Sequence, residues 1–103
     1  MYREAITSYD KAIQLDPKYA NAYNNRGLAY YHNKAYDKAI ADFNKAIELN
    51  PDFARAYNNR AHAYYQQKAF NKAAQDVRRA QDLNFAVDPE ILENLRRVAG
   101  KKN

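Results

Sequence analysis

The sequence of 103 residues has no cysteine, only two glycines and three prolines, and no long apolar run. Without cysteine the chain has no disulfide framework, no thiol nucleophile and no thiolate metal site. An apolar content of 47% with so little glycine and proline excludes a collagen-like repeat, a linker or a disordered tail. No run approaches the roughly 20 apolar residues that cross a bilayer, and the N-terminus carries no signal-peptide core. We therefore expect a soluble domain without membrane insertion, with the cytoplasm as its default compartment.

The net charge of +5 is unevenly distributed along the chain. Residues 1–52 carry seven basic and seven acidic side chains, and residues 80–103 carry four of each. The whole excess lies in residues 53–79, where Asp76 is the single acidic residue against six basic ones: Arg55, Arg60, Lys68, Lys72, Arg78 and Arg79. A partner attracted by charge is therefore expected to be acidic and to contact this stretch.

An internal repeat of 34 residues is the strongest signal in the chain. Residues 20–50 and 54–84 are identical at 17 of 31 positions, and residues 2–17 match 36–51 at 8 of 16. Self-similarity at a fixed period of this length is typical of a repeat architecture. The first copy matches only the second half of the unit, so we expect its first half to be missing from this chain.

Each unit is predicted to form two helices. In the first complete unit, apolar and small residues recur at three- and four-residue steps over 20–30 and again over 39–47. Pro51 ends the second helix because proline disfavours helical geometry in the residue before it. Gly27 and Ala39 let the two backbones approach closely, while aromatic side chains fill the space between turns. Such a hairpin cannot bury its apolar face alone, so it must stack on its neighbours in a solenoid.

These residues resemble the tetratricopeptide repeat (TPR) family, whose 34-residue unit carries an aromatic-x2-Leu-Gly-x2-Tyr…Ala-x3-Phe…Pro pattern. The corresponding residues are Tyr23, Arg26, Gly27, Tyr30, Ala39, Phe43 and Pro51, then Tyr57, Arg60, Ala61, Tyr64, Ala73, Val77 and Phe85. The resemblance implies an all-α fold, a right-handed α-solenoid of antiparallel helix hairpins with six helices. Lys34 and Lys68 stand where the family usually turns on glycine, and a left-handed lysine costs about 1 kcal/mol.

Residues 1–103 are expected to form a single TPR domain. Its parts are a second-helix half repeat at 2–17, full repeats at 18–51 and 52–85, and a C-terminal capping helix at 88–99. The six helices are expected near residues 2–15, 20–34, 36–49, 54–68, 70–83 and 88–99. The outer face of the capping helix is expected to carry Glu93, Asn94, Arg96 and Arg97.

The chain offers no convincing catalytic or metal-binding set. His32 and His62 lie 30 residues apart, and no third ligand is evident on the same face. Asp42 and Asp76 recur at one position of the second helix, as expected of a repeated solvent-facing residue. No glycine-rich phosphate loop and no nucleophile–base pair is present. We therefore expect no enzyme activity, no metal and no cofactor, and a structural role for Arg26 and Arg60 through their aliphatic stems.

The TPR resemblance implies that the first helices of successive units line a concave surface on which partners bind. Carried over residue by residue, this groove comprises Asn21, Asn24, Asn25, Leu28, Tyr31, His32, Arg55, Asn58, Asn59, His62, Tyr65 and Gln66. Asparagine costs helix propensity, yet each unit carries a pair of them, and its amide can both donate to and accept from a peptide backbone. Copying of the unit would by itself also produce these repeated residues.

The Asn-Arg-Gly and Asn-Arg-Ala stretches also resemble chaperone-binding TPR domains, which clamp a C-terminal carboxylate with Lys, Asn and Arg from three successive first helices. Asn25 and Arg55 match this type and Asn59 is a further candidate, but the upstream helix is absent. Asn59 stands where the clamp would have arginine. The resemblance therefore implies an incomplete clamp.

The function expected from these features is non-catalytic: a protein–protein interaction module that holds a peptide or protein segment, with acidic character selected by Arg55. The alternatives are binding of RNA or another polyanion by the basic second repeat, although nucleic acid is not the expected partner, and a purely structural segment of a longer array. Ile6, Tyr9 and Ile13 lack a first helix to pack against. We expect them to favour self-association through residues 2–15.

Overall fold

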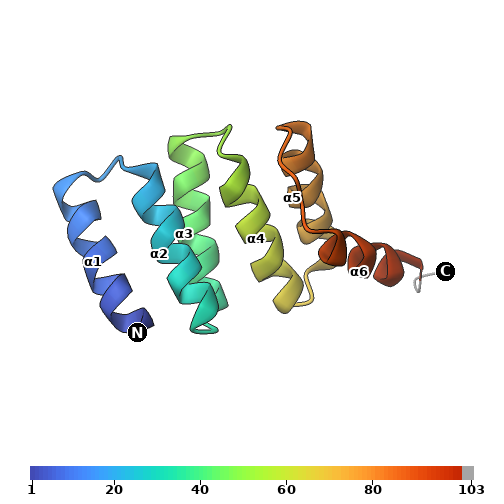
Figure 1. The fold of residues 1–103 in the computed structure, drawn as a ribbon, viewed down its shortest axis with the longest axis horizontal. Coiled ribbons are helices and arrows are strands. Elements are labelled where there is room, and N and C mark those ends of the chain that lie inside the picture. The colour runs from blue at the N-terminus through green and yellow to red at the C-terminus, as the bar shows by residue number, and fades with distance from the viewer. Residues whose placement is uncertain (101–103) are drawn as a thin grey trace.

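Six helices make up residues 1–100, the part of the chain that the computed structural model describes, and these residues contain no strand. The helices are α1 (Tyr2–Leu15), α2 (Ala20–His32), α3 (Tyr36–Leu49), α4 (Ala54–Gln66), α5 (Phe70–Asp82) and α6 (Pro89–Gly100). Helices α1 to α5 alternate in direction along a row, and α6 lies obliquely across the end of that row (Figure 1). The predicted all-α solenoid with six helices is confirmed. The last three residues of the expected domain lie outside the described residues.

The turns after α2, α4 and α5 share one backbone geometry. Lys34, Lys68 and Asn84 have positive φ angles of 63°, 63° and 64°. In the first of these turns, the Lys34 amide donates to the carbonyl of Tyr31 at 2.9 Å, and the Ala35 amide donates to that of Tyr30 at 2.8 Å. This pair of bonds is a Schellman motif, which satisfies carbonyls at the end of the helix and offsets the cost of a left-handed lysine.

Two helices approach each other closely at Gly27, where α2 packs on α3. A Cβ atom on Gly27 would lie 2.6 Å from Cε1 of Phe43 and 3.1 Å from the carbonyl oxygen of Ala39. Phe43 is fully buried, so its ring fills the space that the missing side chain leaves. One unit later the equivalent positions hold Ala61 and Val77, which belong to one buried cluster. Where the first helix has alanine instead of glycine, the second helix therefore has valine instead of phenylalanine.

Two clusters of buried apolar residues lie along the row. One gathers Ala39, Phe43 and Ala63, with Tyr30, Tyr31 and Ile40 packed around it. The other begins at Ala61 and extends through α5 to Val87, Ile91 and Leu95. Through this second cluster α6 covers the end of the core, although it contacts α5 far less extensively than α4 does.

Two buried ion pairs correct the expectation that Asp42 and Asp76 face solvent, because these residues are only 5% and 4% exposed. The guanidinium of Arg26 donates from Nε and Nη2 to both Asp42 oxygens at 2.8 and 2.7 Å. Arg60 makes the same bidentate pair with Asp76. The hydrogen bond to the aspartate raises the pKa of each arginine. The arginines are structural, as predicted, but they act through their charged groups and not only through their stems.

Each arginine also reaches the preceding unit. Nη1 of Arg26 donates to Oδ1 of Asp10 at 2.9 Å, and Nη1 of Arg60 donates to Oδ1 of Asn44 at 2.8 Å. One guanidinium group therefore joins three helices in each case: its own first helix, the second helix of the same unit and the second helix of the unit before.

Candidate functional site

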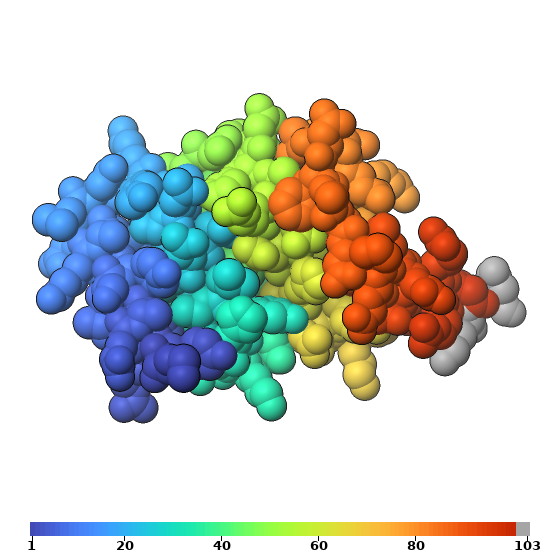
Figure 2. Space-filling model, viewed as in Figure 1, coloured from blue at the N-terminus to red at the C-terminus, as the bar shows by residue number. Residues whose placement is uncertain are grey.

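Two neighbouring cavities lie on the face formed by α2, α4 and the start of α6. These three helices are exposed side by side on the face seen in Figure 2. The central pocket has a volume of about 290 Å³ and is lined by Leu28, Tyr31, His32, Asn58, Asn59 and His62. The terminal pocket has a volume of about 240 Å³ and is lined by His62, Tyr65, Gln66, Asp88, Glu90, Ile91 and Asn94. The structure therefore brings eight of the twelve predicted groove residues into two cavities that share His62.

The central pocket has an aromatic wall centred on Tyr31. Its ring meets His32 edge-on at a centroid distance of 5.4 Å and His62 at 6.4 Å. Burial raises the pKa of the Tyr31 phenol and lowers the pKa of the His62 imidazole. His62 is therefore neutral at pH 7, and together with Leu28 it gives the pocket an uncharged lining suited to an apolar side chain.

The paired asparagines of α2 and α4 have different roles. Nδ2 of Asn59 donates to Oδ1 of Asn24 at 3.0 Å. Because Asn24 is only 2% exposed, it holds α4 against α2 and has no surface to offer a ligand, which corrects its predicted place in the groove. Asn58, one unit after Asn24, has a buried Oδ1 without a hydrogen-bond partner in the described residues. The position that would supply its donor, 34 residues after Asn59, holds Glu93, whose carboxylate can only accept.

Besides the buried Asn24, three predicted groove residues line neither cavity. Asn21 and Asn25 are exposed on α2, one turn apart, and Arg55 is exposed in the first turn of α4. Asn25 and Arg55 are the residues that match a carboxylate clamp by type. Asn59, which stands at the clamp's arginine position, is already bonded to Asn24.

Helix α6 supplies a wall of the terminal pocket that the sequence did not predict. Oδ1 of Asp88 accepts the Glu90 amide at 3.0 Å and so caps the helix, which leaves the second carboxylate oxygen free. Asn94 is half-buried beside His62, which corrects its predicted place on the outer face. The signal for this placement is the connection to α6, residues 83–88, which is longer than the three residues joining α4 to α5 and lets α6 cross the row obliquely.

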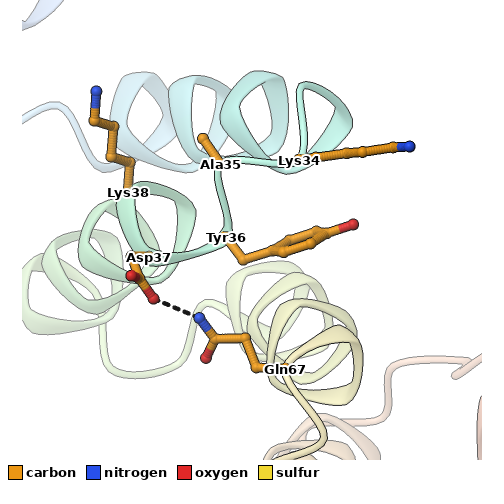
Figure 3. Close-up of a pocket in the computed structure, with 6 residues that line it drawn as sticks. All are labelled: Lys34, Ala35, Tyr36, Asp37, Lys38 and Gln67. Atoms are coloured by element: carbon orange, nitrogen blue, oxygen red, sulfur yellow. Dashed lines mark hydrogen bonds between the residues drawn. The ribbon is translucent and has the colours of Figure 1, made fainter.

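A third cavity, of about 340 Å³, lies at the turn between α2 and α3 and is lined by residues 34–38 and Gln67 (Figure 3). Gln67 donates from Nε2 to Oδ1 of Asp37 across it. The amines of Lys34 and Lys38 point in different directions, so they do not converge on one anion (Figure 3). A similar cavity recurs one unit later at residues 68–72, which marks it as a feature of the repeated turn.

Residues 1–100 hold neither a metal-type cluster nor a membrane-spanning helix. Within this range no three His, Cys, Asp or Glu side chains gather as a metal site would require. No helix in the same range has the length and apolar content needed to span a bilayer.

Comparison with known proteins places these features in a family context. Models described as tetratricopeptide repeat match residues 20–53 and 43–75, and a model described as TPR repeat matches residues 2–34. No curated protein sequence matches the chain.

Among solved structures, the first TPR of Spaghetti (RPAP3) bound to the HSP90 peptide SRMEEVD is 30% identical, with a TM-score of 0.84 over 97% of this chain and 79% of that one. The TPR domain of Arabidopsis OM64 is 26% identical, with a TM-score of 0.85 over 93% and 81%. The TPR2B domain of yeast Sti1, in complex with pHsp70, is 29% identical, with a TM-score of 0.84 over 99% and 85%.

Proposed function

The chain belongs to the tetratricopeptide-repeat family, and on that premise we propose that it is a non-catalytic interaction module that holds an extended peptide or protein segment across α2, α4 and the start of α6. The observation that carries this proposal is the pair of cavities that share His62 on the face of the first helices. The two volumes, about 290 and 240 Å³, lie at the lower limit of the range for whole small-molecule sites. Each therefore has the size to receive one side chain of a longer ligand.

The central pocket anchors the segment through an apolar side chain. Transfer of such a side chain out of water supplies roughly 1.5–3 kcal/mol, and Tyr31 and the two histidines provide its walls. The exposed amides of Asn21 and Asn25 hydrogen-bond to the backbone of the segment beside the anchor. Because only the anchor contact depends on a side chain of the ligand, binding tolerates sequence changes outside the anchor position.

The structural relatives support a peptide as the ligand. The Spaghetti TPR binds an HSP90 peptide, and the Sti1 TPR2B domain forms a complex with pHsp70. In this chain Arg55 is exposed and attracts a carboxylate at the α4 end of the groove. Two of the six basic side chains of the stretch 53–79 already pair within the fold, Arg60 with Asp76 and Arg79 with Asp52.

A library of random dodecamer peptides displayed on phage tests the groove. Peptides selected on the wild-type domain are measured against Leu28→Asp, which places a charge in the central pocket, and against Ala41→Asp, a matched control at an exposed position of α3. We expect at least a tenfold loss of affinity for Leu28→Asp only. Equal binding by both variants would exclude the groove, and a steep fall of affinity with salt would indicate polyanion binding instead.

We also propose that α1 mediates self-association. No residue of α1 is buried, and Leu15 is 87% exposed, whereas the equivalent helix α3 buries Phe43 completely. Sedimentation across a hundredfold range of concentration measures this. A dimer that disappears in Leu15→Lys supports the proposal, and a monomer at every concentration refutes it.

A further inference from the structure

We propose that the terminal pocket is a subsite for a lysine or arginine side chain, so that the bound segment combines an apolar anchor with a nearby basic residue. This inference rests on the proposed groove and specifies the chemistry of its ligand. Its basis is the juxtaposition of two carboxylates, an aromatic ring and two amides around one cavity of about 240 Å³.

The charge of the terminal pocket favours a cation. Asp88 and Glu90 line it from α6, and His62, its one titratable neighbour on α4 besides the Tyr65 phenol, is neutral at pH 7 because burial lowers its pKa. The N-terminus of α6 opposes a cation with a partial charge of about +0.5. Two full negative charges exceed this, so the pocket stays electronegative.

Arg97 is a competing cation, because it contacts Asn94 in the wall of the terminal pocket. Its Nη2 donates to Oδ1 of Asn94 at 3.2 Å, but Arg97 is exposed and does not line the cavity. Its charge is therefore screened by solvent and weakens the field in the pocket without filling it. Removing this charge should strengthen the binding of a basic peptide.

The lining also fits the shape of a long basic side chain. Tyr65 and Ile91 provide apolar surface for the aliphatic stem, while the free Asp88 oxygen, Glu90 and the Gln66 amide accept hydrogen bonds from the charged head. Because His62 borders both cavities, the side chains in them belong to neighbouring parts of one segment. The central pocket therefore selects an apolar residue of the ligand, and the terminal pocket selects a basic residue near it.

The test compares dodecamers selected from the phage library on wild-type protein with those selected on Asp88→Asn/Glu90→Gln. This variant removes both charges, and asparagine keeps the N-cap. Asp82→Asn/Glu48→Gln is the matched control, because it removes two exposed carboxylates that line neither cavity. We expect an apolar residue with a nearby lysine or arginine on wild-type and control, and the apolar residue alone on the pocket variant.

Calorimetry with the most enriched dodecamer then measures how far its affinity depends on the contact between its basic residue and the two carboxylates of the terminal pocket. Replacing its basic residue with norleucine should weaken binding to wild-type protein about three- to tenfold and leave binding to Asp88→Asn/Glu90→Gln unchanged. The Arg97→Gln variant should bind the original peptide more tightly than wild-type protein does. Apolar enrichment without a basic residue on wild-type protein would overturn the cation subsite and leave the groove standing. Enrichment of neither, or of acidic peptides insensitive to Leu28→Asp, would overturn the groove itself.

Discussion

Substitution of Gly27 by alanine tests whether the packing of α2 on α3 depends on the missing side chain. In an exposed helix this change stabilises by about 1 kcal/mol, because alanine has the higher helix propensity. Here the added Cβ would lie 2.6 and 2.8 Å from two carbons of the Phe43 ring, which is fully buried and cannot move into solvent. Overpacking of this kind costs about 1–3 kcal/mol, so we expect a net destabilisation of about 1–2 kcal/mol.

The next repeat supplies the compensating change. Since Ala61 and Val77 occupy the equivalent positions there, Gly27→Ala combined with Phe43→Val rebuilds that pair in the first unit. Phe43→Val alone leaves a cavity and should cost about 2–3 kcal/mol. The double variant should lose at least about 1 kcal/mol less than the sum of the single losses, as measured by urea unfolding. Stabilisation by Gly27→Ala, or strict additivity in the cycle, would refute the close-approach argument.

Three further outcomes follow from the described contacts. Arg60→Ala should destabilise by about 2–4 kcal/mol because it leaves the Asp76 carboxylate buried without a partner, and Arg60→Met with Asp76→Leu should recover most of that loss in the same unfolding assay. Asn59→Ala should cost about 1–3 kcal/mol by orphaning the buried Asn24 oxygen, whereas Asn25→Ala, at an exposed position, should be nearly neutral. Because the pKa of His62 is lowered in the fold, its contribution to stability is complete above the unfolded value of 6.5 and is lost as the pH falls below it. The urea concentration at the unfolding midpoint should therefore differ less between pH 7.5 and 5.5 in His62→Gln than in the wild-type protein. The difference should remain in His32→Gln.

The positions of five of the helices were predictable because the 34-residue register constrains them twice, once in each copy. Gly27 was also readable, since a glycine between aromatic residues on a helical face indicates a close approach of two backbones. The burial of Asp42 and Asp76 could not be predicted from the sequence. Their partners lie 16 residues away on another helix, and repetition of a carboxylate looks the same whether it faces water or an arginine.

The groove was predictable in outline and not in detail. The resemblance placed the right helices side by side, and eight of the residues it indicated line the two cavities. The register could not show that Asn24 and Asn59 satisfy each other, because that bond depends on the rotation of α4 against α2. It also could not give the angle of α6, because the connection to α6 extends beyond the repeat. This angle brings Asp88 and Glu90 to the pocket.

The arginine that joins three helices in each unit has a consequence for how this short array unfolds. A chain of stacked hairpins can fray from its ends one element at a time when the coupling between neighbours is weak. Because Arg26 and Arg60 each hold a second helix of the preceding unit, detaching that helix breaks a bond to the guanidinium that also satisfies a buried carboxylate. The two couplings differ, since Arg26 meets a second carboxylate in Asp10 while Arg60 meets the neutral amide of Asn44. Added salt should therefore loosen the junction of α1 with α2 before that of α3 with α4, so that fraying at high ionic strength begins at the N-terminal end.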